Sequence, residues 1–301
     1  MSADSVFTLA DLDTWSFDGT ALAVVGHPVK HSISPAMHNA ALAELAKKES
    51  RFSTWRYFKF EIDPITLPLA LRQFHEKQFF GLNLTVPHKV IAVPHVAQIN
   101  PAAEAAGAVN TLLWAPGGYV GYNTDGAGLE AAVHEAFGRS LADTPVILLG
   151  AGGAARGAAA ECLARGCAGL WIANRSKGNL GTLLDSLAPL AGRVRLHGFD
   201  PARPPADLPE ALVINATSAG MRRDDPAPID LAQLPRPLGV YDMIYNPPVT
   251  PLLAQAAALG LPRANGLGML IHQGAYALER WIGQPAPADV MRRAAEAAAR
   301  A

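Results

Sequence analysis

The chain has 301 residues, about twice the length of a typical domain of roughly 150 residues, so we expect two domains or one large one. Its residues are 50% apolar and 17% charged, which is ordinary for a globular protein and excludes a disordered chain. Lysine and arginine number 25 against 26 acidic residues, so no overall charge favours nucleic acid or an anionic membrane. Any anionic ligand must therefore be bound by local groups.

The start of the chain and the cysteines indicate the compartment. The first residues, MSADSVFTLADLDTWSFDG, lack a basic start and a continuous apolar stretch, so no signal peptide is expected. No run approaches the roughly 20 apolar residues of a membrane span. Cys162 and Cys167 are too few and unsuitably spaced for a disulfide framework or a zinc site, and we predict no metal. We expect a cytoplasmic protein. The segment before Ala21 has no functional interpretation.

The first part of the chain alternates short apolar runs with helical stretches, which is the pattern of an α/β domain. Ser34 is a good N-cap, and Pro35 suits the first position of the helix that follows. Strands are predicted at 21–25, 54–60, 80–84 and 108–113 and near Tyr119, and further helices at 64–77 and 125–137.

A second α/β unit follows, and its apolar runs suit buried parallel strands. The predicted strands are 146–149, 170–173, 212–214 and 239–241; a helix runs from the turn at 150–153 to Arg165, and helices at 269–281 and 288–299 close the chain.

The turn after the strand at 146–149 has a pattern typical of dinucleotide binding. Gly150-Ala151-Gly152-Gly153-Ala154-Ala155 fits G-x-G-x-x-G/A between a strand and an Ala-rich helix. The first small residue permits the tight turn, the second lets backbone approach a pyrophosphate, and Ala155 permits close packing. The helix N-terminus adds free N–H groups for the phosphates. The alternative is a tight turn that binds no ligand.

The end of the next strand indicates which dinucleotide binds. NAD sites usually place an acidic residue roughly 20 residues after the glycines, where it binds the ribose hydroxyls. This chain has Asn174-Arg175-Ser176-Lys177 there, and a guanidinium can pair with a 2′-phosphate. The sequence therefore favours NADP, with a solvated basic turn as the alternative.

Polar residues at element ends in the first half are candidates for a substrate site. Ser32 and Ser34 precede a helix, so two hydroxyls and backbone N–H groups could hold a carboxylate; alternatively they only cap the helix and shape the loop. Thr85 follows a strand, and Lys89 lies at a helix start, where the dipole disfavours a structural cation. Asp125 is well placed as a helix cap or first-turn acid.

Taken together, these segments resemble the shikimate dehydrogenase family, which reduces 3-dehydroshikimate to shikimate with NADPH in aromatic amino acid biosynthesis. The match extends over nearly the whole chain after the first twenty residues. Its motifs are, in order, Gly26-His27-Pro28, His31-Ser32-Ile33-Ser34-Pro35, Asn83-Leu84-Thr85-Val86-Pro87-His88-Lys89, Gly107-Ala108-Val109-Asn110-Thr111, Asn123-Thr124-Asp125-Gly126, Gly150-Ala151-Gly152-Gly153-Ala154, Asn174-Arg175-Ser176, Asn215-Ala216-Thr217-Ser218, Tyr241-Asp242-Met243-Ile244-Tyr245 and Gly266-Leu267-Gly268-Met269-Leu270 with Gln273.

The resemblance implies roles for individual residues. Lys89 and Asp125 would be the catalytic pair, and Ser32 and Ser34 would bind the substrate carboxylate with Tyr245 nearby. The ring hydroxyls would meet Thr85, Asn110 and Gln273 as well as the catalytic pair. The cofactor would contact the glycine turn, the motif from Asn174 to Lys177, and Thr217, Met243 and Gly266.

The resemblance also implies the domain organisation. An α/β substrate domain would span residues 1–124 and be completed by the C-terminal helices in 266–301. A Rossmann-like NADP domain with a doubly wound parallel sheet would occupy 125–265. The expected partner is the small-molecule substrate, with neither nucleic acid nor membrane, and the expected assembly is a monomer or a homodimer.

One departure from the family pattern affects cofactor choice. Members that prefer NADP usually carry a further Arg three residues after the Ser or Thr of the Asn-Arg-Ser/Thr motif, and this chain has Asn179 there. Lys177 is a candidate replacement. The nearest alternative is a quinate/shikimate or aminoshikimate paralogue using NAD or NADP, and Ser32 and Ser34 together favour shikimate. A non-catalytic nucleotide-binding protein is the alternative from another class.

Overall fold

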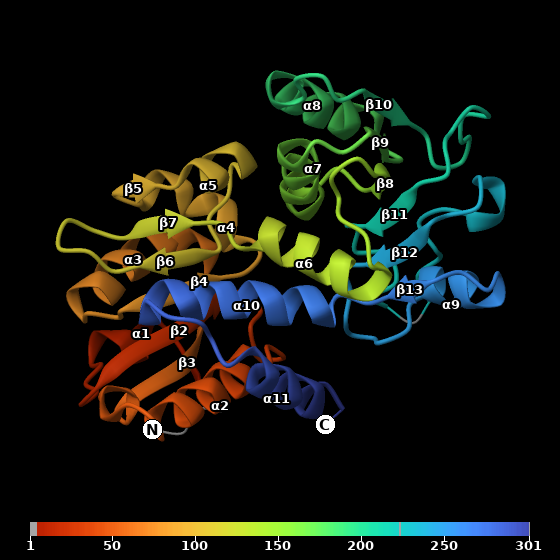
Figure 1. Ribbon diagram of the computed structural model, residues 1–301. Helices are drawn as coiled ribbons and strands as arrows, with labels where there is room; N and C mark the ends of the chain where they lie inside the picture. Colours follow the sequence, from red (N-terminus) through yellow and green to blue (C-terminus); the bar gives the residue numbers. More distant parts are fainter. Residues whose placement is uncertain (1–4, 223, 301) are drawn as a thin grey trace. The chain divides into compact units, whose positions relative to one another are not determined.

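The computed structural model describes residues 5–222 and 224–300, which form two compact units (Figure 1). One unit takes the chain up to Thr124 and again from Ile271 onward, and the other is Asp125–Leu270. Both are α/β, which confirms the predicted fold class. The second unit extends beyond the expected end at 265 because the first turn of a helix that begins at Leu267 packs on its sheet through Met269, whose N–H donates to the Tyr241 hydroxyl.

The first unit contains a seven-stranded mixed sheet of order β1-β3-β2-β4-β6-β7-β5. The strands from β1 to β4 run parallel, β6 is antiparallel to both of its neighbours, and β5 is parallel to β7. The strands are β1 (Val6–Phe7), β2 (Thr20–Gly26), β3 (Trp55–Glu61), β4 (Gly81–Leu84), β5 (Gln98–Ile99), β6 (Thr111–Leu113) and β7 (Val120–Tyr122).

Helices of the first unit cover both faces of this sheet. One face packs in a core with α1 (Leu9–Asp13), α3 (Leu67–Glu76) and α5 (Pro101–Ala106), and α2 (Ser34–Ala46) packs on β3 from the other. Against α2 lies α11 (Ala288–Arg300), which follows α10 (Leu267–Ile282). The predicted helix at 64–77 begins as a 3-10 turn, Pro64–Thr66, because Pro68 takes a first-turn position of α3 where its missing N–H is not needed. A short helix, α4 (His88–Ile91), follows β4.

The N-terminal segment, which had no predicted role, belongs to the core of the first unit. Its strand β1 pairs with β3, and Phe7 and Trp15 pack edge-on and tilted against Phe58 and Phe60 at ring-centroid distances of 4.9–6.0 Å. The segment therefore closes one edge of the sheet with aromatic side chains.

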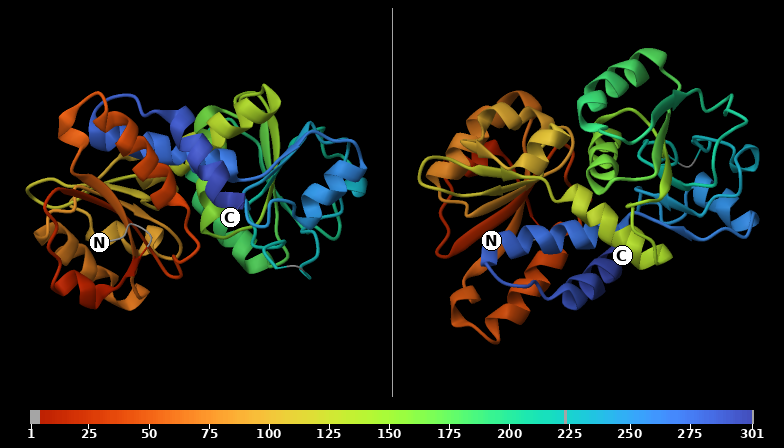
Figure 2. Two further views of the ribbon diagram at one scale, coloured as in Figure 1. Left: turned by 90° about the horizontal axis from the view of Figure 1, so that it is seen from below. Right: turned by 45° about the horizontal axis from the view of Figure 1, so that its top comes forward.

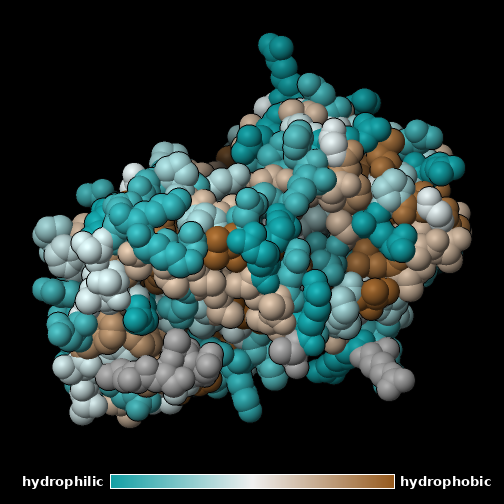
Figure 3. Space-filling view, turned by 60° about the horizontal axis from the view of Figure 1, so that its bottom comes forward, coloured by the Kyte–Doolittle hydropathy of each residue, from teal (hydrophilic) through white to brown (hydrophobic). Residues whose placement is uncertain are grey.

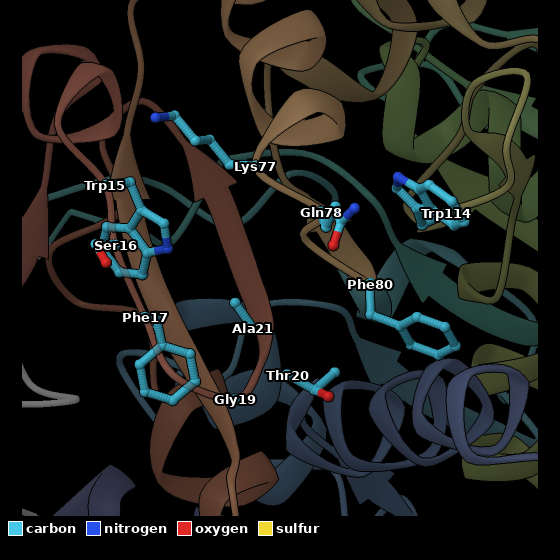
Figure 4. A pocket seen from close by; sticks show the side chains of 10 residues that line it. All are labelled: Trp15, Ser16, Phe17, Gly19, Thr20, Ala21, Lys77, Gln78, Phe80 and Trp114. Carbon is cyan, nitrogen blue, oxygen red and sulfur yellow. The ribbon is translucent and has the colours of Figure 1, made fainter.

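A hollow of about 480 Å³ lies beside this segment at the beginning of β2 and just before β4 (Figure 4). Trp15 and Phe17 line one side of it, and Gln78 and Phe80 line the other. None of the predicted site residues lines it, and the serine loop and Thr85 follow the opposite, carboxyl ends of β2 and β4.

The second unit contains a six-stranded, all-parallel sheet of order β10-β9-β8-β11-β12-β13. In chain order this is 3-2-1-4-5-6, the order of doubly wound dinucleotide-binding sheets, whose ligands bind where the order reverses. The reversal lies between β8 and β11. The strands are β8 (Pro145–Leu149), β9 (Gly169–Ala173), β10 (Leu196–Phe199), β11 (Leu212–Asn215), β12 (Gly239–Asp242) and β13 (Arg263–Ala264).

Alternate residues of the central strands face two separate cores, so helices lie on both sides of this sheet (Figure 2, left). Val146 and Leu148 of β8 pack with α6 (Asp125–Phe137), α7 (Gly153–Arg165) and α8 (Lys177–Leu187). Ile147 and Leu149 pack with α9 (Pro251–Ala258) on the other side. This continuous apolar run is what a strand buried on both faces requires.

Hydrophilic and near-neutral residues cover most of the face shown in Figure 3, and hydrophobic residues are distributed there in separate areas. Among residues 5–222 and 224–300, no helix combines the length and apolar character needed to cross a membrane.

Candidate active site

Ser32 and Ser34 lie where the chain leaves β2 and enters α2. The prediction that Ser34 caps α2 was wrong: Ser34 is itself the first helical residue, Ile33 is the N-cap, and Pro35 follows inside the first turn. The Oγ of Ser32 accepts a 3.4 Å hydrogen bond from the N–H of Ser34, so Ser32 acts as the turn acceptor. Ser34 as a whole residue is 7% exposed, and its hydroxyl makes no hydrogen bond to another described residue.

Thr85 and Lys89 follow the carboxyl end of β4. The N–H of Thr85 donates to Val25 O at 3.0 Å, which ties this turn to the end of β2. The Thr85 methyl lies against Gly26, where a Cβ would come within 2.2 Å of it. Lys89 is half-buried in the short helix α4, and its carbonyl accepts from Val109 N at 2.8 Å. The ends of β2 and β4 thus bring the serine loop and the lysine helix to one edge of the sheet.

Asn110 is the centre of a buried network of polar side chains. Its Nδ2 donates to Thr124 Oγ1 at 2.9 Å and to Gln273 Oε1 at 3.2 Å, and its Oδ1 accepts from the N–H of Thr124 at 2.8 Å. Thr111 Oγ1 also donates to this Oδ1 at 3.0 Å. Gln273 comes from α10, so the network joins the two separate stretches of chain that form the first unit.

Asn83 of β4 holds the backbone of Asn110 in place. It is 6% exposed, and its Nδ2 donates to Asn110 O at 3.2 Å and to Thr111 Oγ1 at 3.1 Å. Its Oδ1 accepts from the Tyr57 hydroxyl at 2.8 Å, and burial raises the pKa of that hydroxyl well above its usual range. Tyr57 is thus a fixed hydrogen-bond donor. The side chains of the network hold one another in fixed orientations through these hydrogen bonds, so binding of a ligand would not have to order them.

A buried lysine, which the sequence interpretation did not single out, lies under the serine loop. Lys59 of β3 is 8% exposed, and its Nζ lies 3.1 Å from Lys30 O and 3.5 Å from Ser32 O. A lysine within a strand of aromatic residues, on the same side as Tyr57, was the available signal.

In the second unit, the glycine turn occupies the reversal point of the sheet. Gly150 has φ +113°, and a Cβ there would lie 3.0 Å from the Thr217 methyl carbon, so this position requires glycine for two reasons. A Cβ on Gly152 or Gly153 would meet nothing within 4 Å, which leaves open space over the turn. Gly152 is the N-cap of α7 and provides no side-chain acceptor to its first turn. Ala155 is fully buried, as close packing of helix on strand requires.

The basic motif lies after β9, the strand next to β8. Asn174 Nδ2 donates to Ser176 O at 2.9 Å, and Ser176 Oγ caps α8 by accepting from the N–H of Asn179 at 3.3 Å. Arg175 and Lys177 are exposed and form no ion pair with another described residue. Asn179, where the family pattern has an arginine, is exposed in the first turn of α8.

A second buried network, centred on Asn215, holds the loops that carry Thr217, Met243 and Gly266. Asn215 Oδ1 accepts from the hydroxyl of Thr217 at 2.7 Å, and its Nδ2 donates to Asp242 Oδ1 at 3.0 Å. A Cβ on Gly266 would lie 2.0 Å from Met243 O, so only glycine fits. Burial is the largest influence on the Asp242 carboxyl and raises its pKa.

Asp125 and Tyr245 are the predicted substrate-site residues that belong to the second unit. Asp125 is the first residue of α6 and follows Thr124 of the Asn110 network directly. Its neighbour Gly126 packs against α7, where a Cβ would lie 2.4 Å from Glu161 Oε2. Tyr245 is half-buried after β12, and burial raises the pKa of its hydroxyl. The roles of both residues stay predictions.

Among the described residues, no group of three or more His, Cys, Asp or Glu side chains could hold a metal ion. The features suited to a cofactor are the open glycine turn at the N-terminus of α7 and the exposed cations after β9. Both suit a phosphate-bearing dinucleotide.

Comparison with known proteins places this arrangement in a family. The model of the shikimate dehydrogenase substrate binding domain matches residues 24–112, and that of the shikimate 5′-dehydrogenase C-terminal domain matches 266–296. The shikimate dehydrogenase (NADP(+)) of Citrifermentans bemidjiense is 41% identical over 276 residues, which are 90% of this chain and 92% of the relative. The chain belongs to the shikimate dehydrogenase family.

Solved structures of related dehydrogenases have the same fold as this chain. The shikimate 5-dehydrogenase of Thermus thermophilus, in complex with NADP(H) and shikimate, has a TM-score of 0.80 and 34% identity, covering 93% of this chain and 99% of that one. The quinate dehydrogenase of Corynebacterium glutamicum, in complex with NAD, has a TM-score of 0.80 and 29% identity, covering 92% and 98%. The predicted family and Rossmann-like fold are thereby confirmed.

Proposed function

We propose that this protein is a shikimate dehydrogenase that catalyses the reversible, NADPH-dependent reduction of 3-dehydroshikimate to shikimate. It is an NADP-dependent oxidoreductase that acts on a CH–OH group. The observation that carries this proposal is the buried Asn110 network at the carboxyl edge of the first sheet, which fixes Gln273 and Thr124 beside the family's motifs. Ordered amide and hydroxyl groups of this kind suit a polyhydroxylated ring.

The residues of the second unit fit NADP. The open space over Gly152 and Gly153 admits a pyrophosphate, which the N-terminus of α7 would bind through its N–H groups. Arg175 and Lys177 carry the positive charge suited to a 2′-phosphate, and Thr217, Met243 and Gly266 would line the remainder. When bound, NADPH supplies a hydride for the ketone carbon.

The proton chemistry is assigned to Lys89 and Asp125 by the family pattern. Reduction breaks the π bond of the ketone and leaves negative charge on its oxygen, which the Lys89 ammonium stabilises. Lys89 Nζ then donates the proton that completes the hydroxyl, and in the oxidative direction neutral Lys89 accepts it. The role proposed for Asp125 is to orient Lys89 or to hold the neighbouring ring hydroxyl.

The remaining residues bind and orient the ring. Ser32 and Ser34 are proposed to bind the carboxylate, and the position of Ser34 in the first turn of α2, with no hydrogen bond from its hydroxyl to another described residue, supports this. Tyr245 is proposed to lie near that carboxylate. Thr85, Asn110 and Gln273 are proposed to bind ring hydroxyls, with the Asn110 network setting their orientation.

Steady-state kinetics tests the assignment. Purified protein should consume NADPH in the presence of 3-dehydroshikimate and reduce NADP in the presence of shikimate. Absence of turnover above background in both directions would contradict the proposal. Arg175→Ala should lower kcat/KM for NADPH roughly tenfold while leaving that for NADH within twofold. The control is Arg193→Ala, at an exposed arginine outside the motif.

A quinate dehydrogenase is the second candidate, supported by the 29% identical structure from Corynebacterium glutamicum. Both serines being retained favours shikimate, because the pocket for quinate's additional hydroxyl often differs there. A comparison of kcat/KM for shikimate and quinate, each with NADP and NAD, separates the two. Preference for quinate with NAD would overturn the main assignment.

The proposal includes a cytoplasmic location and a monomer or homodimer as the assembly. The location is supported by Cys162 and Cys167, which are free thiols. Both are buried in the core between the second sheet and α6, α7 and α8, and free thiols are usual in a reducing compartment. Sedimentation velocity at several protein concentrations distinguishes the two assemblies.

A further inference from the structure

Lys59 lies on the face of β3 opposite to the aromatic core. Alternation along the strand places Phe58 and Phe60 in the core with Trp15, and puts Tyr57, Lys59 and Glu61 on the side that faces α2. The lysine side chain is almost wholly buried, since only 8% of its surface is exposed. Its Nζ donates to the carbonyls of Lys30 and Ser32, the loop that carries the serine hydroxyls.

Within the part of the chain that the structure describes, Lys59 forms no ion pair, and both acceptors of its Nζ are neutral carbonyls. Glu61, two residues along the same face, is directed elsewhere: its Oε2 accepts from Val29 N at 3.3 Å, and its Oε1 lies 3.9 Å from His27 Nδ1. Lys30 and His31 are exposed on the loop. Burial of a cation without an anionic partner is unfavourable, so the position calls for an anion.

The serine loop provides the place for that anion. Nζ is 3.5 Å from the carbonyl of Ser32, whose own Oγ is already engaged with the N–H of Ser34. A carboxylate at the two hydroxyls would thus bind to the same loop whose carbonyls accept from the ammonium. Opposite charges attract more strongly where water is partly excluded than in bulk water.

We propose that Lys59 is a specificity-determining residue that positions the Ser32–Ser34 loop and supplies the positive charge that selects a carboxylate-bearing substrate. This inference rests on the proposed function, because it takes shikimate to be the ligand of the loop. Lys59 holds the loop through the carbonyls of Lys30 and Ser32, while the hydroxyls of Ser32 and Ser34 contact the carboxylate.

The test compares shikimate with its neutral methyl ester in wild type, Lys59→Met and Lys30→Met. We expect Lys59→Met to raise the KM for shikimate at least tenfold and the KM for the ester less than twofold, with the Kd for NADP unchanged. Lys30→Met removes an exposed charge from the same loop and should change both KM values less than twofold. Lys59→Arg should retain the preference for shikimate over the ester.

Equal increases in KM for the acid and the ester would show that Lys59 only holds the loop, and an unchanged KM for shikimate would remove any role; both overturn the inference. If Lys59→Met fails to fold, Lys59→Gln keeps a hydrogen-bond donor while removing the charge, and the same selective loss is required of it. Turnover by wild type with no selective loss contradicts the Lys59 role alone. Absence of wild-type turnover contradicts the proposed function and this inference with it.

Discussion

In the first unit two predicted substrate residues, Asn110 and Gln273, belong to a network of side-chain hydrogen bonds, whereas in the second unit the predicted cofactor turn consists of backbone beside open space. Asn110 and Thr111 are at most 1% exposed, and each makes several hydrogen bonds within that network. Gly152 and Gly153 are exposed and have no neighbour where a Cβ would be.

The difference follows from what each ligand offers. A ring with several hydroxyls is distinguished by donors and acceptors at fixed positions, and such groups must be held by others because unsatisfied buried polar groups are costly. A pyrophosphate is recognised by charge and by many equivalent N–H groups, so close approach of the backbone matters more than side chains. Substitutions should therefore affect stability and binding together in the first unit and separately in the second.

The largest expected effect is on the chemical step. Lys89→Met should lower kcat by about 10³-fold, since it removes both the stabilising charge and the proton donor. The Kd for NADP, measured by calorimetry, should stay within twofold of wild type. Lys48→Met, at an exposed lysine of the same unit, is the matched control. Near-normal turnover of Lys89→Met would show that the proton donor is misassigned.

Asn110→Leu tests whether the substrate network couples binding to stability. Loss of this side chain leaves Thr124, Thr111 and Gln273 without their shared partner. We expect the free energy of unfolding to fall by about 3 kcal/mol and the KM for shikimate to rise. Gln273→Ala, at the half-buried rim of the network, should raise KM with a loss of less than about 1 kcal/mol. Urea unfolding and steady-state kinetics on both variants measure these changes.

His38 provides a pH-dependent test of the same unit. It is fully buried, stacked on Tyr57 at 4.2 Å between ring centroids, and burial lowers its pKa from 6.5 to about 3. Below pH 6.5 the unfolded chain binds a proton there that the folded chain does not, so stability falls as pH falls. Between pH 7 and 5 the loss should be about 2 kcal/mol from this residue.

The measurement is urea unfolding at both pH values for wild type, His38→Leu and His134→Leu. The part of the pH dependence due to His38 should be absent from His38→Leu and present in His134→Leu, which alters an exposed histidine of α6. An identical pH dependence in wild type and His38→Leu would contradict the assignment.

At the glycine turn, substitutions should change cofactor binding and stability independently of each other. Gly152→Ala introduces a methyl group into open space at φ −91°, which alanine adopts readily, so stability should change by less than about 0.5 kcal/mol. Its KM for NADPH should rise roughly tenfold because the methyl group occupies the phosphate approach. Gly150→Ala, at φ +113° and against Thr217, should instead cost about 2 kcal/mol of stability. Equal effects of the two substitutions on stability would remove the contrast.

Much of this arrangement could be predicted, because the motifs lie where strands end. Gly150 follows β8, Arg175 follows β9 and Thr85 follows β4, and parallel strands bring their carboxyl ends to one edge. Local signals such as turn glycines and strand alternation suffice for those positions. The error at Ser34 was one residue, because Pro35 is equally compatible with the second helical position.

Other features depend on contacts between distant parts of the chain. Lys59 meets Ser32 across 27 residues, and Gln273 meets Asn110 across 163, so no local pattern indicates either pair. Asp242 received no role from its motif, yet it fixes the loop at Ile244 and accepts from the hydroxyl of Thr250 at 2.6 Å. The role of the segment before Ala21 likewise became evident only from the pairing of β1 with β3.

That segment has a consequence for association between molecules. The sheet of the first unit ends on both sides in two-residue strands, β1 and β5, which offer few unpaired N–H and C=O groups to another chain. Without β1, the seven-residue, aromatic-rich β3 would become the terminal strand. Val6 and Phe7 thus protect β3 from edge-to-edge aggregation, and removal of β1 should lower the solubility of the protein.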